Sequence, residues 1–147
     1  AAPIGWDLDD SGTVDLLYAG DLLGNVWKFD VSGNSPATWD SAFKAAGKPK
    51  PFFVAMDDAS KPQPITGAMS MGLNPTTFAS SLFFGTGRYL TLDDPANQDV
   101  QSWYGLIDAG AVIAGRNALL RRKIVNDTTS FGTHVRAFEF AVDGDMA

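Results

Sequence analysis

The stretch VDLLYAGDLLGNVWKFDV, residues 14–31, decides the fold class of this chain. A β-branched and aromatic run over 14–19 is followed by a glycine-containing turn, and a second such run covers 26–31. In the second run, Trp27, Phe29 and Val31 alternate with the residues between them, which is the period of a strand. The stretch therefore predicts an antiparallel hairpin around Gly24-Asn25.

Further strands are predicted on both sides of short polar connections. They cover 52–55, 64–72, 81–87 and 102–108, with a turn over 74–77 and a polar loop over 93–99. Because prolines closely flank the first of these strands, we expect it at a sheet edge. With roughly seven or eight strands and no long helix in the whole pattern, the sequence indicates an all-β protein.

Two segments leave alternatives open. Residues 36–46 fit either a short helix or an irregular coil that lays Trp39 and Phe43 onto a sheet. Towards the C-terminus, strands are predicted over 119–125 and 135–142, although 111–123 also fits a helix interrupted by a glycine.

The composition limits the class of protein. The 147 residues match one domain, and 45% hydrophobic with 19% charged residues excludes a disordered, collagen-like or coiled-coil chain. Because 17 acidic residues oppose 11 basic ones, the net charge is −6, and nucleic acids and anionic membrane surfaces are poor partners. The absence of cysteine excludes a disulfide scaffold, a thiolate zinc site and a cysteine nucleophile.

The chain shows neither a membrane segment nor a leader. No apolar run approaches the ~20 residues that a membrane-spanning helix needs, so we expect no membrane span. The chain opens on Ala1-Ala2-Pro3 without a signal peptide, and we interpret it as a segment of something longer.

The segment DLDDSGTVD, residues 7–15, has the spacing of a calcium loop. Oxygen-bearing side chains stand at positions 1, 3, 5 and 9, with glycine at position 6 for a sharp turn. The predicted metal ligands are the side chains of Asp7, Asp9, Ser11 and Asp15 and the backbone carbonyl of Thr13. Alternating side chains of a tight loop point to one centre, where a hard cation such as Ca²⁺ collects oxygens.

This loop departs from the EF-hand pattern in two places. Ser11 stands where Asp or Asn is usual, and Tyr18 stands where a bidentate glutamate closes an EF-hand. We therefore predict a shorter calcium loop, closed by Asp15 and leading into a strand. The alternative is a plain Asp/Ser/Gly turn with solvated acids.

Signatures of catalysis are scarce. His134 is the single histidine, which excludes a histidine-rich metal site and leaves one candidate for a catalytic triad. The pairs Asp57-Asp58 and Asp93-Asp94 fall in loops and are interpreted as solvated. The string GTGR at 85–88 lacks the helix of a phosphate loop, so we interpret its glycines as close strand packing. The basic run RRK at 121–123 is interpreted as a solvated face. Since none of these features indicates catalysis, we predict that the chain is not an enzyme.

The aromatic residues of the predicted strands have two interpretations. A ligand could stack on Trp27, Phe29, Trp103 and Tyr104, but core packing between sheets is favoured. We expect Trp27 in particular to be buried against a neighbouring sheet.

Four strings occur in the order found in one family. Residues 7–30, QPIT at 63–66, FGTGRYL at 84–90 and QSWYGLID at 101–108 resemble the C-terminal β-propeller of PilY/PilC-type type IV pilus biogenesis proteins. A loose repeat of strand, polar loop, aromatic strand and aspartate in 14–31 and 82–108 also fits propeller blades. One departure is Ala68-Met69, where the family usually has Ala-Pro.

The resemblance implies a partial β-propeller of two to three blades of antiparallel strands, because a blade needs ~40–45 residues. Residues 1–147 are then a single fragment of a larger propeller, with the calcium loop at 7–15, the hairpin at 14–31 and further blade strands over 52–142. It further implies a location at the bacterial cell envelope or surface (fimbrium, outer membrane or secreted), and a calcium-loaded loop that influences pilus extension and retraction, and often adhesion.

The implied partners are pilus components or a host surface ligand, and the remainder of the propeller. Because exposed strand edges recruit partners, we also expect self-association, or shielding of an edge by 32–50 or 93–101. Two other interpretations remain: a blade fragment of a quinone-dependent dehydrogenase, suggested by Gly20-Asp21, Gly24-Asn25, Trp27 and Asp30, and a generic carbohydrate- or protein-binding β-domain.

Overall fold

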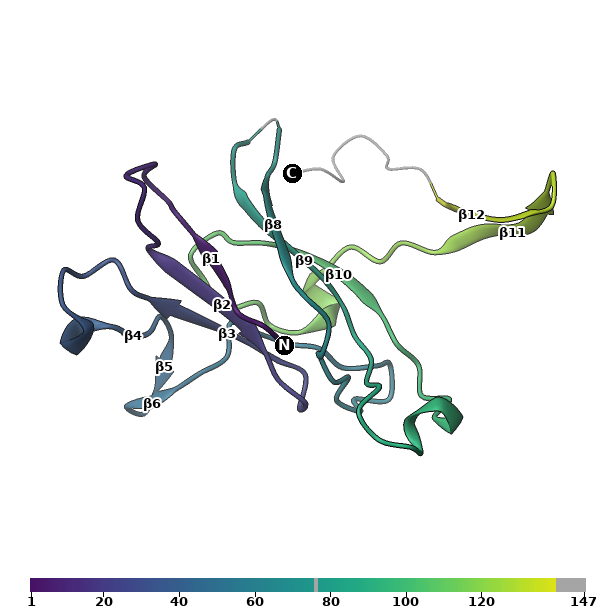
Figure 1. Ribbon diagram of the computed structural model, residues 1–147, viewed down its shortest axis with the longest axis horizontal. Coiled ribbons are helices and arrows are strands. Elements are labelled where there is room, and N and C mark those ends of the chain that lie inside the picture. The colour runs from purple at the N-terminus through teal and green to yellow at the C-terminus, as the bar shows by residue number, and fades with distance from the viewer. Residues whose placement is uncertain (76, 140–147) are drawn as a thin grey trace. The chain divides into compact units, whose positions relative to one another are not determined.

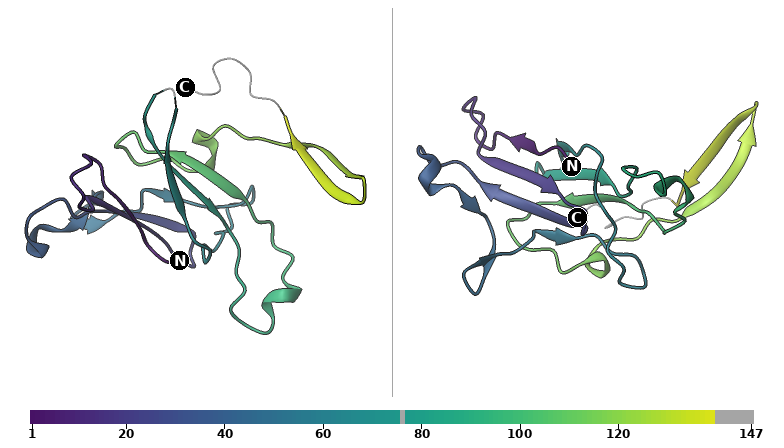
Figure 2. Two further views of the ribbon diagram at one scale, coloured as in Figure 1. Left: turned by 45° about the horizontal axis from the view of Figure 1, so that its top comes forward. Right: turned by 60° about the horizontal axis from the view of Figure 1, so that its bottom comes forward.

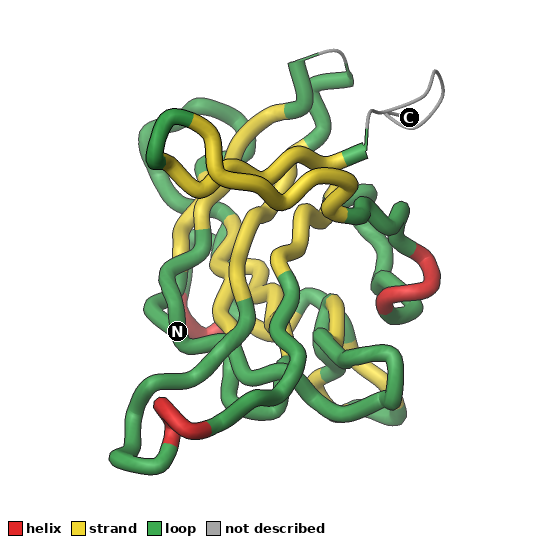
Figure 3. The backbone as a smooth tube through the Cα atoms, turned by 90° about the vertical axis from the view of Figure 1, so that its right-hand side faces the viewer, coloured by secondary structure: helices red, strands yellow, loops and turns green. Residues whose placement is uncertain are grey.

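The fold is all-β, as predicted. The computed structural model describes residues 1–75 and 77–139, and divides into two units, Ala1–Arg116 and Asn117–Ala147. Strands and loops make up nearly all of the described chain (Figures 1 and 3). The helices of the described residues are single turns of 3₁₀ type, η1 (Pro36–Thr38), η2 (Asp94–Ala96) and η3 (Arg116–Ala118). Each pairing between the labelled strands is antiparallel.

The first sheet is built around the predicted hairpin. Its strands are β1 (Ile4–Trp6), β2 (Leu16–Gly20), β3 (Asn25–Asp30) and β4 (Asp40–Ser41), and β7 (Phe53–Val54) also pairs with β3. The hairpin β2–β3 is confirmed, and its strands lie side by side in Figure 2. Its connecting turn ends at Gly24, with φ at +78°, where an added Cβ would lie 2.5 Å from the carbonyl oxygen of Ala55. Only glycine fits this position.

The second sheet has the order β10 (Trp103–Ile107), β9 (Ser80–Gly85) and β8 (Ser70–Leu73). The strands predicted over 81–87 and 102–108 are confirmed, but the one predicted over 64–72 begins only at Ser70. The preceding residues cross to the end of β9 instead, where Ile65 forms a parallel bridge with Gly87. Part of the predicted turn over 74–77 lies at residue 76, outside the described residues.

The helix considered for 36–46 is wrong. After η1 the backbone of Trp39 is extended, and the chain forms a small hairpin of β5 (Lys44–Ala45) and β6 (Lys48–Pro49). Ala46 and Gly47 at its turn both have positive φ, which ends any helix there. The coil alternative holds for Phe43, which stacks on Phe52 at 6.0 Å between ring centroids.

The second unit is a hairpin of β11 (Ile124–Ser130) and β12 (Thr133–Phe138). The predicted strands over 119–125 and 135–142 are right in kind and displaced in position, and 140–142 lie outside the described residues. Phe131 and Gly132, both with positive φ, make the two-residue turn that pairs Ser130 with Thr133. The helix considered for 111–123 is reduced to η3.

The core of the first unit lies between the two sheets. Phe53 of β7 contacts Tyr104 of β10 at 5.2 Å between centroids, and Phe84 of β9 contacts the same ring at 5.3 Å. Other buried members are Tyr18, Val26, Phe52, Ala55, Ile65, Met69, Leu82 and Leu106. The two sheets therefore bury one face each against the other.

Trp27 corrects one prediction. The residues of β3 that face the core are Val26 and Lys28, so Trp27 lies on the other face and is only half-buried. Its indole N–H donates to the carboxylate of Asp21 at 2.9 Å, which holds the ring beside the hairpin turn. Trp103 is 70% exposed on the outer face of β10, whereas Tyr104 is buried as predicted.

A buried ion pair joins the two sheets. Nζ of Lys28 lies 2.5 Å from Oδ2 of Asp108, and the Tyr18 hydroxyl donates to the same oxygen. The ammonium group also lies 5.9 Å and 5.7 Å from the ring centroids of Tyr18 and Phe43. Burial raises the pKa of Asp108, but the hydrogen bonds from Lys28 and Tyr18 outweigh it and hold the pKa below its usual value.

Asp94 corrects the interpretation of the Asp93-Asp94 pair as solvated. Asp94 is only 6% exposed, and its carboxylate accepts bonds from the amides of Leu90 and Thr91 at 2.7 and 2.8 Å and from Nε of Arg88 at 2.8 Å. These bonds, led by the two amides, lower the pKa of Asp94 to about 2. Asp94 therefore organises the loop that follows β9, and Asp93 beside it is exposed.

We predict that Asp108→Ala lowers the free energy of unfolding by ~3–5 kcal/mol, because it leaves the ammonium of Lys28 buried without its counter-charge. The matched control is Asp99→Ala, which breaks the exposed pair of Asp99 with Lys61, also at 2.5 Å, and should cost under ~1 kcal/mol. Urea unfolding at pH 7 measures both losses. Equal losses in the two variants would contradict the role given to the buried pair.

A second prediction concerns acid stability. Since the pKa of Asp94 is about 2 in the folded chain and ~3.9 in an unfolded one, Asp94 stabilises the fold above the higher value and loses this effect as the pH falls towards the lower. Asp94→Asn should therefore flatten the decline in stability between those two pH values. Urea midpoints from pH 5 to pH 2 test this, with Asp93→Asn as control. A decline as steep as that of the parent chain would refute it.

Candidate metal centre

The predicted calcium loop connects β1 to β2 at one end of the first sheet, in purple in Figure 1. The strands bring its ends together, since Trp6 pairs with Leu16 and the amide of Asp15 donates to the carbonyl of Trp6 at 3.0 Å. The carbonyl of Asp15 accepts in turn from the amide of Val31 at 2.7 Å. The loop is therefore closed at its base by backbone pairing.

Three of the predicted ligands converge. Asp7, Asp9 and Asp15 each present a carboxylate oxygen, and these oxygens lie within 4.8 Å of one another. Within the part of the chain that the structure describes, this is the sole such group of three acidic, histidine or cysteine side chains. Asp7 and Asp15 are half-buried, and Asp9 is exposed.

Backbone amides of the loop hold these carboxylates in place. The amide of Ser11 donates to Asp7 and to Asp9, both at 3.1 Å, and the amide of Gly12 donates to Asp7 at 2.7 Å. Asp15 accepts from the amide of Leu8 at 2.8 Å. Hydrogen bonds from Ser11 lower the pKa of Asp9, which favours its ionised form.

Ser11, the fourth predicted side-chain ligand, lies in the same turn. The hydroxyl oxygens of Ser11 and Thr13 are 2.8 Å apart and exposed. Gly12 has φ at +85° and Asp10 has φ at +60°, so two left-handed residues fold the loop back on itself. The predicted donor set consists of carboxylate, hydroxyl and carbonyl oxygens, which are the ligands of hard cations such as Ca²⁺.

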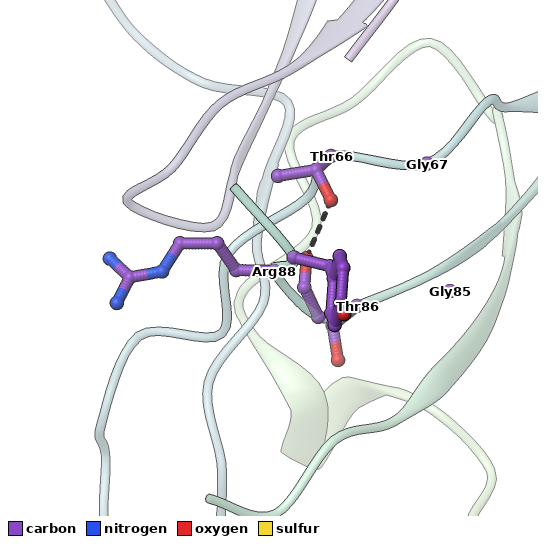
Figure 4. A pocket seen from close by; sticks show the side chains of 7 residues that line it. Thr66, Gly67, Gly85, Thr86 and Arg88 are labelled. Atoms are coloured by element: carbon purple, nitrogen blue, oxygen red, sulfur yellow. Dashed lines mark hydrogen bonds between the residues drawn. The ribbon is translucent and has the colours of Figure 1, made fainter. Parts of the chain in front are cut away.

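The GTGR string lies beside an open pocket, and its residues have contacts within the fold. Figure 4 shows the open pocket of about 330 Å³ beside it, where the Thr66 hydroxyl donates to the carbonyl of Gly87 at 2.8 Å. Gly87 is needed for its φ of +136°, whereas the nearest atom to an added Cβ at Gly85 lies 3.9 Å away, so close strand packing is not the reason for Gly85. Nε of Arg88 is bonded to Asp94.

Two other polar candidates, Asp57 and His134, have contacts within their own units. Asp57 accepts from the amides of Ala59 and Lys61, both at 2.8 Å, in a turn. Nε2 of His134 lies 2.8 Å from the carboxylate of Asp127 across the exposed hairpin of the second unit.

In the described residues, no helix is long and apolar enough to cross a membrane.

Sequence reasoning missed two buried polar residues that hold the sheets together. One is Lys28, and the other is Gln63, whose amide donates to the carbonyl of Val100 at 2.8 Å and accepts from the hydroxyl of Tyr104 at 2.7 Å. A signal for Lys28 was present, because it shares a strand face with Val26. Gln63 lies in an irregular segment, where no periodicity marks the buried side.

Comparison with known proteins agrees with the resemblance seen in the sequence. The model of the PilY1 beta-propeller domain family matches residues 1–128. A type IV pilus biogenesis factor PilY1 homolog of Xylella fastidiosa is 43% identical over 115 residues, which are 77% of this chain and 8% of that protein. Type IV pilus biogenesis factor PilY1 of Pseudomonas aeruginosa is 34% identical over 118 residues, which are 69% of this chain and 10% of that protein.

A solved structure gives the same answer for the fold. The crystal structure of the Pseudomonas aeruginosa PilY1 C-terminal domain superposes with a TM-score of 0.77 at 28% identity, over 96% of this chain and 34% of that one. The chain spans about a tenth of the length of these curated relatives. Since the family model covers most of the chain and the sheets match a solved relative, this chain belongs to the PilY1 β-propeller family.

Proposed function

We propose that this chain is a non-catalytic, calcium-binding part of a type IV pilus biogenesis protein at the bacterial cell envelope or surface. The observation that carries the proposal is the convergence of Asp7, Asp9 and Asp15 in one loop. The names of the relatives support the pilus assignment, and favour it over a quinone-dependent dehydrogenase.

The loop offers oxygens of the kind that Ca²⁺ binds, fewer than its usual ~6–8 ligands. The carboxylates of Asp7, Asp9 and Asp15 would hold the ion, together with the hydroxyl of Ser11 and the carbonyl of Thr13. Without an ion the three carboxylates repel one another, so binding relieves that repulsion. Because no bidentate glutamate closes the site, we expect a Kd in the range of roughly 10⁻⁵–10⁻³ M.

Regulation of the pilus follows from this chemistry as part of the proposal. An ion that orders the β1–β2 connection changes the surface that the propeller offers to pilus components or to a host ligand, and so biases extension, retraction and adhesion. The carboxylates that respond to Ca²⁺ are exposed or half-buried, so the ion reaches them from solvent.

The free sheet edges support a further part of the proposal. β10 ends its sheet, and within the described ranges 1–75 and 77–139 no strand pairs with its outer edge. We assign this edge to the remainder of the propeller, or to self-association where that remainder is missing.

The metal proposal predicts stabilisation by calcium. Ca²⁺ at a hundredfold over its Kd should raise the free energy of unfolding by ~2.7 kcal/mol, because it binds only the folded loop. Asp9→Ala should abolish this gain, whereas Asp10→Ala should keep most of it, since position 10 is not among the converging carboxylates. Mg²⁺ should substitute poorly, because it gives up its water reluctantly. Thermal melting with Ca²⁺, with Mg²⁺ and with a chelator measures all three effects.

The outcome that refutes the site is an unchanged melting temperature together with no heat of Ca²⁺ binding by calorimetry. The pilus assignment has its own test. In bacteria that carry the complete protein, Asp9→Ala should alter surface piliation and twitching while Asp10→Ala leaves both near the parent level.

A further inference from the structure

A groove lies beside the calcium loop. Its volume is about 480 Å³, within the ~300–1,000 Å³ typical of ligand pockets. The calcium loop, β2 and the segment after β3 contribute its lining, in which Val14, Leu17, Val31 and Trp39 are apolar and Thr13 and Asn34 are polar. The groove opens at the same end of the first sheet as the loop.

One wall of the groove is fixed by the fold alone. Trp39 is 47% exposed, and its indole N–H donates to the carbonyl of Gly33 at 2.8 Å. The indole is thus held in place before any ligand arrives, which lowers the entropic cost of binding.

The opposite wall belongs to the calcium loop. Val14 is 45% exposed and packs over β1, since an added Cβ at Gly5 would lie 3.0 Å from both Val14 methyl groups. In the chain it stands between Thr13 and Asp15, the last two proposed ligands. Backbone pairing already holds Asp15, so an ion bound to the carbonyl of Thr13 would fix the remaining side of Val14, and with it this wall.

We propose that the groove is a calcium-controlled docking site for an extended basic segment of a partner protein that inserts an apolar side chain. The inference rests on the proposed calcium function, because the ion would fix the Thr13 side of Val14, which backbone pairing does not hold. The apolar walls accept an aliphatic or aromatic side chain.

The negative charge beside the groove determines which residues of the partner flank the inserted side chain. None of the groove's lining residues is charged, and Asp15 and Asp30 directly adjoin Val14 and Val31 in the chain. The loop alone holds four aspartates, which exceed the charge of one Ca²⁺, and the whole chain carries −6. Lysine or arginine beside the inserted side chain therefore complements this rim.

The sign of the calcium effect separates ordering from simple electrostatics. Ca²⁺ reduces the negative charge beside the groove, so electrostatics alone would weaken the binding of a basic peptide. Tighter binding with Ca²⁺ can only come from the ordered wall. By linkage, the peptide must then tighten Ca²⁺ binding by the same factor.

The experiment uses three synthetic hexapeptides as probes, alternating Leu with Lys, Leu with Glu, and Ser with Lys. Calorimetry on the 147-residue chain, with saturating Ca²⁺ and with a chelator, gives each affinity. We expect the Leu–Lys peptide to bind at least about tenfold tighter with Ca²⁺, and the other two to bind weakly under both conditions.

Two variants locate the effect. Val14→Ser and Trp39→Ala should each remove Leu–Lys binding while changing Ca²⁺ affinity in peptide-free protein less than twofold. The matched control is Leu8→Ser, an exposed loop residue outside the groove, which should preserve both.

Failure of this proposal is distinguishable from failure of the calcium site. No heat of Ca²⁺ binding sinks the proposed function. Normal Ca²⁺ binding with unchanged or weaker Leu–Lys affinity overturns the coupling. Equal binding of the Leu–Glu peptide, or persistence of Leu–Lys binding in both variants, overturns the basic occupant or the groove.

Discussion

Lys28 and Asp108 meet between the two sheets, and the arrangement of the first unit depends on that contact. Each would be costly to bury alone, so the side chains of β3 and of the residue after β10 are acceptable in the core only together. The Tyr18 hydroxyl completes the group, and burial followed by the bond to Asp108 raises the pKa of Tyr18, which keeps it a donor. The sheets are therefore held in one relative position by polar bonds, while the aromatic contacts around Phe53 and Tyr104 supply the buried area.

That constraint extends outward along β3 to the metal centre. Because Lys28 must face the core, the residues on either side of it face outward. The same register places Val31 at the end of the sheet, where its amide donates to the carbonyl of Asp15. The position of Asp15 is thus set by the hairpin register rather than by the loop. The loop contributes Asp7 and Asp9, which its own amides aim at the same point.

The parts of the fold that sequence patterns predicted are those in which periodicity and turn chemistry agree. The β2–β3 hairpin and β10 are right because alternation and flanking turns indicate the same strands. Trp27 was assigned to the wrong face because hydrophobicity favours burying an indole over an ammonium group. The ion pair of Lys28 with Asp108 reverses this preference, and Asp108 lies 80 residues away in the chain. The convergence of Asp7, Asp9 and Asp15 was predictable because it depends on local spacing. The groove was not, because Val14 and Trp39 line one groove only in the folded sheet.

The acidic residues of this chain divide by the origin of their donors, and this division supports the functional assignment. Asp21 accepts hydrogen bonds from the side chains of Asn25 and Trp27. Burial raises the pKa of Asp21, but these bonds outweigh burial and hold the pKa below its usual value. Asp94 and Asp108 each have a cationic partner. Asp21, Asp94 and Asp108 all stabilise the fold. Asp7, Asp9 and Asp15 differ, because their donors are neutral groups of their own loop, and neutral donors do not cancel a cluster of three charges. A divalent cation would complete such a cluster, which supports the proposal that the loop, and not the buried acids, is a metal site.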